Sequence, residues 1–207
     1  MAENGTSGEE RRVWFELRLL ADIGMVGLPS VGKSTLLSVL TKARPKIAAY
    51  PFTTLEPQLG QLQLGGREVV LADLPGLIEG ASQGKGLGTA FLRHVAHCQA
   101  LWFVVAVPEE DLLEQIKTPA ELATTVWQQY QLLQQELVAA YPEAKATKHL
   151  VVLNKIDILP EVIQQAIVKT FSKHKTPLMC ISGATGEGLA ELKAQSLARF
   201  MESQDSE

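Results

Sequence analysis

The fold is decided by residues 27–35, which read Gly27-Leu28-Pro29-Ser30-Val31-Gly32-Lys33-Ser34-Thr35. This stretch fits the P-loop pattern G-x-x-x-x-G-K-[ST], and it lies between an apolar strand at 23–26 and a helical pattern that begins at Lys33. The glycines allow consecutive backbone N–H groups to turn toward phosphate oxygens, and the helix N-terminus adds its positive end. We therefore expect Lys33 to neutralise the β- and γ-phosphates of a nucleotide and the Ser34 hydroxyl to bind Mg²⁺.

Apolar runs alternate with helical patterns on both sides of this loop. The predicted strands lie at 15–20 leading into 23–26, 59–64, 68–72, 101–107, 150–153 and 178–181. The predicted helices lie at 33–43, 88–97, 120–141, 161–172 and 189–200. Several strands are apolar at nearly every position, as strands covered on both faces must be. We therefore expect an α/β fold, with a mostly parallel six-stranded sheet flanked by helices on both faces.

Composition indicates one soluble domain with short ends. The chain has 207 residues, 46% of them hydrophobic, and a formal net charge of −4. We expect a flexible N-terminal arm at 1–12, one globular domain at 13–200 and an acidic tail at 201–207. No apolar run approaches the roughly 20 residues of a membrane span, and the net charge argues against a bulk nucleic-acid binder. Two cysteines, Cys98 and Cys180, favour a reducing compartment, so the expected location is the cytoplasm or an organelle.

A second nucleotide motif follows the strand at 68–72 and reads Asp73-Leu74-Pro75-Gly76. It lies at the carboxyl end of that strand, which is the edge of such a sheet where ligands bind. There Asp73 can hold the Mg²⁺ shell, and the Gly76 N–H can meet the γ-phosphate. By itself this pattern is an ordinary turn, but its position after a P-loop favours the site.

A third motif, Asn154-Lys155-Ile156-Asp157, follows the strand at 150–153 and concerns the base. The Asp157 carboxylate can accept two hydrogen bonds from the N1–H and amine of guanine, whereas adenine offers an acceptor at N1. Lys155 can lay its stem over the ring, and Asn154 can tie this loop to the P-loop. The run Ser182-Gly183-Ala184 follows the strand at 178–181, and its backbone N–H groups can meet the guanine O6.

Two further stretches contain candidate metal ligands. The stretch Tyr50-Pro51-Phe52-Thr53-Thr54-Leu55-Glu56-Pro57 places two hydroxyls beside Phe52, and spacing alone does not choose between Thr53 and Thr54 as an Mg²⁺ ligand. The group His94, His97 and Cys98 has the spacing of a metal cluster. It lacks a second ligand pair elsewhere, so a helix is the better interpretation.

These five elements, in this order, are those of a small GTPase-type domain, and the chain most closely resembles the Obg family of GTPases. The resemblance covers residues 13–200 and implies that they form an OBG-type G domain. It rests above all on Tyr50 to Leu55 and on Asp73-Leu74-Pro75-Gly76-Leu77-Ile78-Glu79-Gly80-Ala81. The resemblance implies Thr54 as the Mg²⁺ ligand and Lys33, Thr54 and Gly76 as the catalytic groups. It further implies a monomeric, Mg²⁺-dependent GTPase switch whose partner is the large ribosomal subunit and its rRNA during assembly.

The chain departs from this family at several positions. Obg proteins usually carry Asn where Ser30 stands, and an Asn there helps related GTPases bind K⁺, so the departure counts against K⁺ activation. Gly183 replaces the usual Ala of the S-A pair, a mild change because the contact uses the backbone. Leu77 stands where Ras-like proteins carry a water-orienting Gln, which predicts slow intrinsic hydrolysis. The glycine-rich domain that precedes the G domain in Obg proteins is not found in the sequence, and ribosome docking by that domain is an expectation.

Two other functions stay open on the residues alone. One is a nucleotide-gated interaction module that binds GTP or GDP with negligible turnover, which Ser30 and Leu77 motivate. The other is a P-loop kinase acting on a small substrate. The motif at 154–157 and the lack of an evident Arg-rich lid argue against the kinase.

Overall fold

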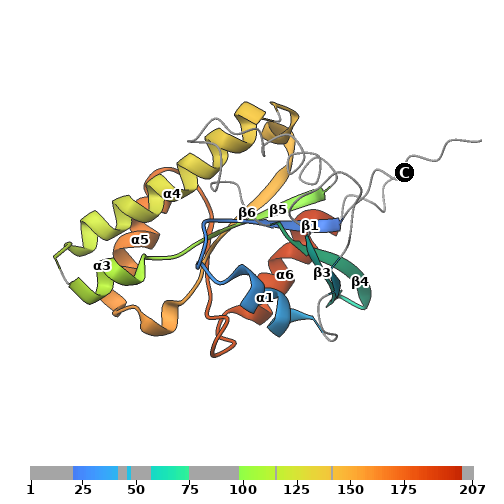
Figure 1. Ribbon diagram of the computed structural model, residues 1–207, viewed down its shortest axis with the longest axis horizontal. Helices are drawn as coiled ribbons and strands as arrows, with labels where there is room; N and C mark the ends of the chain where they lie inside the picture. The colour runs from blue at the N-terminus through green and yellow to red at the C-terminus, as the bar shows by residue number, and fades with distance from the viewer. Residues whose placement is uncertain are drawn as a thin grey trace, which may run out of the picture.

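The computed structural model describes residues 21–41, 46–47, 57–74, 98–114, 116–140 and 142–201, and these form one seven-stranded sheet between two layers of helices (Figure 1). The strand order is β2-β3-β4-β1-β5-β6-β7. Strands β4, β1, β5, β6 and β7 pair in parallel, and the β2–β3 and β3–β4 pairs are antiparallel. The strands are β1 (Ala21–Val26), β2 (Lys46–Ile47), β3 (Gln58–Leu64), β4 (Arg67–Asp73), β5 (Cys98–Val105), β6 (Lys148–Leu153) and β7 (Leu178–Cys180).

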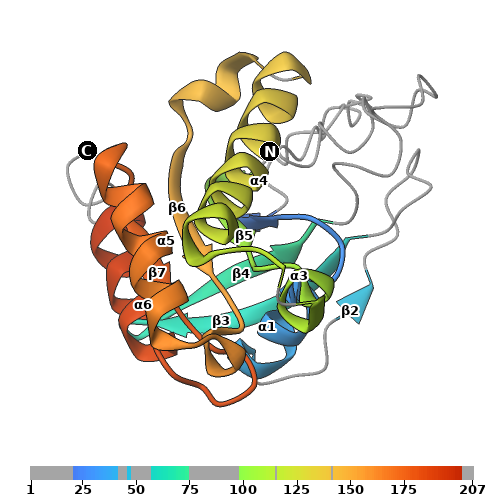
Figure 2. The same cartoon turned by 90° about the vertical axis from the view of Figure 1, so that its left-hand side faces the viewer.

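Helices cover both faces of the sheet. On one face, α4 and α5 pack over the side chains of β5 and β6, and on the other α1, α6 and η4 cover β1, β4 and β5. Figure 2 shows β2 and β7 at opposite sides of the sheet. The α-helices are α1 (Lys33–Leu40), α3 (Glu109–Glu114), α4 (Pro119–Ala140), α5 (Glu161–Lys173) and α6 (Leu189–Ser196). Short 3₁₀ turns are η2 (Pro142–Ala146) and η3 (Ile156–Ile158), and η4 (Leu197–Met201) is a π-helical turn.

Helix α4 shows how the spacing of apolar residues specifies a helix that packs on the sheet. Its apolar residues recur at steps of three and four, so they share one face, and that face is buried against the sheet. The helix begins with a capping box in which the Thr118 N–H donates to Glu121 Oε2 (2.7 Å) and the Glu121 N–H donates to Thr118 Oγ1 (3.3 Å). The buried residues of the pattern are Leu122, Val126, Tyr130, Leu133 and Leu137.

The predicted fold class is confirmed, with local differences. The predicted strands at 23–26, 59–64, 68–72, 101–107, 150–153 and 178–181 are present among the described residues, and the two-residue strand β2 adds a seventh at the edge. Strand β5 ends at Val105 rather than 107, and the short helix α3 after it was not predicted. The predicted helix at 189–200 divides into α6 and η4. The predicted strand at 15–20, the predicted helix at 88–97 and the proposed end segments lie outside the described residues, apart from Met201.

Of the two cysteines, Cys98 belongs to the hydrophobic core and Cys180 packs against it. Cys98 is buried at the start of β5, and burial together with the charge of Asp22 raises its pKa to about 12. Burial also raises the pKa of Cys180. Among the residues that the structure describes, no group of three His, Cys, Asp or Glu side chains could hold a metal ion.

A polar link crosses the aromatic layer between α4 and the sheet. The Phe103 ring lies edge-on to both Tyr130 and His149, with centroid distances of 5.4 and 5.3 Å. The Tyr130 hydroxyl and His149 Nε2 are 3.1 Å apart, and Gln134 Nε2 donates to the same hydroxyl (2.9 Å). Burial lowers the pKa of His149 and the positive charge of Arg199 lowers it further, while the contact with the Thr147 carbonyl opposes them.

This histidine should make the fold sensitive to mild acid. Because its pKa is lower in the folded than in the unfolded chain, the unfolded chain binds the proton more readily, so stability is lost as the pH falls below about 6.5. We expect the melting temperature to fall between about pH 7.5 and pH 5.5, and to fall less in a His149→Gln variant. Melting curves followed by circular dichroism measure this. An equal fall in both chains would show that another group is responsible.

Candidate nucleotide-binding site

Four loops of the sequence motifs meet at one edge of the sheet, at the carboxyl ends of parallel strands. The P-loop follows β1, Asp73 ends β4, the 154–157 loop follows β6, and the 182–184 loop follows β7. In open α/β sheets this is the edge where ligands bind. The order β4-β1-β5-β6-β7 therefore brings together residues that lie more than a hundred positions apart in the chain.

Both motif glycines of the P-loop are required by close contacts. A Cβ atom on Gly27 would lie 2.4 Å from the Val104 carbonyl oxygen of β5. Gly32 has a φ of 93°, and a Cβ there would lie 2.4 Å from Asn154 Nδ2. Ser30 also has a positive φ of 62°, a region that Asn occupies more readily than Ser. A side chain at Gly27 or Gly32 would therefore force the loop out of this shape.

Lys33 begins helix α1 and reaches back across the loop. Its Nζ donates to the carbonyl oxygens of Gly27 (3.0 Å) and Leu28 (3.1 Å). These contacts hold the ammonium group over the P-loop, directly before the N-terminus of α1. An anion at this place would meet the Lys33 charge and the helix dipole together.

Ser34 and Asp73 form the candidate metal site. The Ser34 hydroxyl donates to Asp73 Oδ2 at 2.6 Å, although the residues lie 39 positions apart in the chain. Asp73 is 6% exposed, and its Oδ1 atom is buried without a hydrogen-bond partner among the described residues. Buried carboxylate oxygens normally accept hydrogen bonds. A buried carboxylate oxygen without such a bond, beside a hydroxyl, is a suitable ligand for a hard cation such as Mg²⁺.

Asn154 joins three of the loops. Its Nδ2 donates to the Val31 carbonyl oxygen of the P-loop (2.8 Å), and its Oδ1 accepts from the Gly183 N–H (3.0 Å). The residue is 2% exposed, so neither bond competes with water. One buried amide therefore fixes the P-loop, the base loop and the 182–184 loop relative to one another.

Lys155 and Asp157 follow on the same loop. Lys155 has a φ of 64°, and its Cε would lie 3.9 Å from a Cβ on Gly32, so its stem runs beside the P-loop. Asp157 lies on the short turn η3 and is exposed at this edge. A carboxylate in that position is open to donors of a bound base.

The loop at 182–184 has fewer open donors than the sequence predicted. The Gly183 N–H is used by Asn154, and the Ala184 N–H donates to the buried Ser182 Oγ at 3.2 Å. Thr185 donates to the same oxygen at 3.0 Å. Because Gly183 is engaged, the exposed Ala184 offers the N–H that can turn to a guanine O6.

Glu109 is a site residue that sequence reasoning missed. Its Oε1 accepts from Lys155 Nζ at 2.7 Å, and this contact and the charge of Lys155 lower the pKa of Glu109. A cavity of about 360 Å³ lies beside them, bordered by the P-loop at 28–31, the segment 106–110, Gln129 and Lys155. The pair is separated by 46 positions in the chain, so no local pattern could have revealed it.

Removing this ion pair should weaken nucleotide binding slightly. In a Glu109→Gln variant the Lys155 stem is held less firmly beside the P-loop, and we expect GTP affinity to fall roughly two- to fivefold, the range for an exposed pair. Glu110→Gln removes the same charge one position along without touching Lys155. Titration with a fluorescent GTP analogue measures both, and equal losses would show that only the overall charge matters.

The remaining predicted site residues lie outside the described part of the chain: Phe52, Thr53, Thr54, Pro75 and Gly76. Leu74 is described and buried, and its N–H donates to the Met25 carbonyl oxygen (3.2 Å), which aligns the end of β4 with β1. Thr35, the last residue of the P-loop motif, lies in the first turn of α1 and its carbonyl accepts from the Ser38 hydroxyl. In the described ranges, no helix is both long and apolar enough for a bilayer crossing.

Solved structures of two other proteins have similar folds. A structure of Era from Aquifex aeolicus superposes with a TM-score of 0.60 at 21% identity, covering 87% of this chain and 56% of that one. The G domain of the FeoB iron transporter from T. maritima gives a TM-score of 0.55 at 23% identity and covers 86% of this chain and 96% of that one. At these identities the match establishes the P-loop G-domain fold.

Curated relatives are more similar in sequence. GTPase Obg from Persephonella marina is 46% identical over 193 residues, which are 92% of this chain and 54% of that protein. GTPase Obg from Syntrophotalea carbinolica is 47% identical over 201 residues, 96% of this chain and 53% of that protein. The chain thus spans about half the length of the curated relatives it matches.

The predicted resemblance to Obg GTPases is confirmed by these matches. The family model described as 50S ribosome-binding GTPase matches residues 22–155, which include the P-loop, Asp73 and the Asn154-Lys155 pair. Because the match covers well over half of the chain, the protein belongs to the family of 50S ribosome-binding GTPases.

Proposed function

We propose that this chain binds GTP and hydrolyses it to GDP and phosphate as a Mg²⁺-dependent switch. The observation that carries the proposal is the buried amide of Asn154, which joins the phosphate loop to the two loops expected to contact the base. This link between the loops supports the binding of one nucleotide across all three of them. Family membership supports the same reaction.

Binding follows from the contacts of the site. On GTP binding, Lys33 exchanges its bonds with the Gly27 and Leu28 carbonyls for the β- and γ-phosphate oxygens. Asp157 accepts from the guanine N1–H and amine, and the Lys155 stem covers the ring. The Ala184 N–H exchanges Ser182 Oγ for the guanine O6.

Ser34 and Asp73 would hold Mg²⁺. The family resemblance implies that Thr54 is a further ligand. When bound, Mg²⁺ neutralises charge that develops on the phosphate oxygens. A water molecule attacks the γ-phosphorus in line. The bond from that phosphorus to the bridging oxygen breaks, and GDP leaves with the electron pair. Lys33 stabilises the charge that develops on the β-phosphate of the leaving GDP. One proton of the attacking water stays on the inorganic phosphate and the other passes to solvent. Loss of the γ-phosphate releases Thr54 and Gly76.

A competition experiment tests the nucleotide. Labelled GTP bound to the chain should be displaced by unlabelled GTP and GDP and not by ATP at the same concentration, because Asp157 offers acceptors only. Equal displacement by ATP would contradict guanine recognition. If single-turnover hydrolysis is no faster than the hydrolysis of free GTP, the chain is a nucleotide-gated binding module rather than an enzyme. Ser30 motivates this alternative.

The response to K⁺ follows from Ser30. We expect equal hydrolysis rates in KCl and NaCl, since the side chain that would help bind K⁺ is missing. Asn accepts a positive φ more readily than Ser, so Ser30→Asn should fit the same backbone and should raise the rate in KCl above that in NaCl. Ser30→Ala is the matched control. Stimulation of the unaltered chain by K⁺ would contradict this expectation.

We further propose a cytoplasmic or organellar monomer that acts on the large ribosomal subunit during assembly. The family description and the Obg relatives support that partner. Co-sedimentation with ribosomal subunits in the GTP, GDP and nucleotide-free states tests it. Comparison with a longer form that carries an N-terminal glycine-rich domain tells whether these 207 residues dock by themselves.

A further inference from the structure

The edge of the sheet opposite the nucleotide loops gathers positive charge. Strands β6 and β7 begin there, α5 and α6 run back toward it, and η2 and η4 lie beside it. Because β6 has six residues at about 3.3 Å each, this edge lies roughly 20 Å from Asn154. A ligand at this edge would not touch a nucleotide at the other.

The basic residues of this edge come from three short segments, at 142–149, 173–177 and 197–201. These segments carry five Lys or Arg side chains and one carboxylate, that of Glu143, in a chain whose formal net charge is −4. All five are exposed. They are Lys145, Lys148, Lys173, Lys175 and Arg199, and we call them the basic edge.

A cavity of about 280 Å³ lies within the basic edge. Three of its lining side chains are Lys148, His149 and Arg199, and two carry hydroxyls, Thr147 and Thr176. No carboxylate lines it, among the residues described. Burial is the main cause of the lowered pKa of His149, and the positive charge of Arg199 lowers this pKa further.

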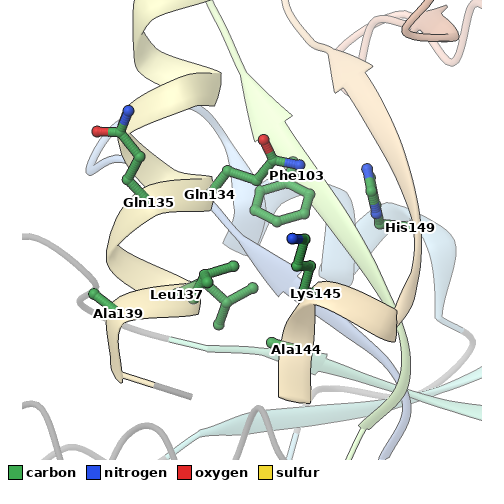
Figure 3. A pocket seen from close by; sticks show the side chains of 9 residues that line it. Phe103, Gln134, Gln135, Leu137, Ala139, Ala144, Lys145 and His149 are labelled. Carbon is green, nitrogen blue, oxygen red and sulfur yellow. The ribbon is translucent and has the colours of Figure 1, made fainter. Parts of the chain in front are cut away.

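A larger cavity of about 450 Å³ lies next to the first and shares His149 with it. Figure 3 shows Gln134 and Leu137 entering it from α4, Ala144 and Lys145 from η2, and His149 from β6, around the Phe103 ring. Lys145 thus extends the positive charge from the first cavity toward the second. The charged area is wider than one small anion would use.

We propose that the basic edge binds the phosphodiester backbone of RNA, with one phosphate in the 280 Å³ cavity between Lys148 and Arg199. Arg, Lys and Thr side chains are the usual phosphate ligands in nucleic-acid complexes, and this cavity holds all three. The charge continues beyond this cavity at Lys173 and Lys175, which lie close in the chain to its lining residue Thr176, and at Lys145, which lines the larger cavity. A polyanion needs such an extended set of charges, and a free phosphate does not. This proposal rests on the proposed ribosomal function for the identity of the natural RNA. Binding of a model RNA to the basic edge can be tested whether or not that function is correct.

Salt-dependent binding of a labelled RNA tests this surface. The GDP-saturated chain is titrated into a fluorescein-labelled single-stranded RNA oligonucleotide at several salt concentrations. For each lost phosphate contact, the slope of log K against log salt should become shallower by about 0.7. We expect this change, and roughly tenfold weaker binding at low salt, in Arg199→Gln. Arg199→Lys should restore most of the affinity because it keeps the charge.

Control variants separate a local site from general charge. Lys169→Gln removes an exposed positive charge from the middle of α5, outside the three segments, and should change RNA affinity less than Arg199→Gln. Lys145→Gln is a second test variant if Arg199→Gln melts at a lower temperature. GDP affinity should be unchanged in all of these variants. Failure of the RNA proposal can therefore be distinguished from failure of the proposed GTP binding.

Four results would overturn the inference. They are no RNA binding at low salt, equal losses in Lys169→Gln and Arg199→Gln, displacement of RNA by inorganic phosphate at equal phosphate concentration, and preferential binding of polyglutamate. The third would indicate a free-anion site, and the fourth an acidic protein partner.

Discussion

An Asp157→Asn variant should prefer xanthine nucleotides to guanine nucleotides. The carboxylate can accept from both the N1–H and the amine of guanine, whereas an amide presents a donor where that amine would lie. The same donor suits the oxygen that xanthine carries there. We expect GTP affinity to fall by two orders of magnitude or more, about the loss for a site left with an unpaired polar group, while XTP affinity rises.

The exposed position of Asp157 makes this test clean. No hydrogen bond of the described residues uses its side chain, so the variant should melt at the same temperature as the unaltered chain. Competition of GTP and XTP against one labelled nucleotide gives the preference directly. If the variant with the unchanged melting temperature still prefers GTP, Asp157 does not recognise the base.

An Asn154→Ala variant should lose both nucleotide binding and stability. It leaves the Val31 carbonyl and the Gly183 N–H without their partner in a buried place, which costs about 3 kcal/mol for the two together. The P-loop and the base loops then no longer hold one another in position. We expect GTP affinity to fall about a hundredfold and the melting temperature to fall by several degrees.

Gln164→Ala is the matched control for this second prediction. The Gln164 amide also makes two hydrogen bonds, to the carbonyl oxygens of Ile156 (3.1 Å) and Leu159 (2.9 Å), but neither reaches the P-loop. It should lower stability with a much smaller effect on GTP affinity. If the two variants lose affinity in proportion to their stability, Asn154 acts only on folding and does not organise the site.

Much of the fold was predictable because its parts have strong local patterns. The strand before Gly27 and the helix after Lys33 follow from the P-loop context, and the buried face of α4 follows from its three- and four-residue spacing. The apolar runs before Asp73 and Asn154 have the pattern of parallel strands, and this pattern predicts that both residues lie at one edge of the sheet.

The rest depended on contacts that no local pattern records. Strand β2 has two residues, too few for an alternation to appear, and α3 begins just after an apolar run that looked like continuous strand. Leu189, Leu192 and Phe200 keep helical spacing, so the change to a π-helical turn at Leu197 leaves no trace in the sequence. The pair of Lys155 and Glu109 and the use of the Gly183 N–H by Asn154 arise from tertiary packing.

Strand β6 connects the two surfaces discussed above, since Lys148 and His149 begin it and Asn154 follows its end. Its central residues are fully buried and paired on both sides, with β5 and with β7. If RNA binds the basic edge as proposed, it and the nucleotide occupy opposite ends of this strand, and a small displacement of β6 along its own axis would couple the two sites.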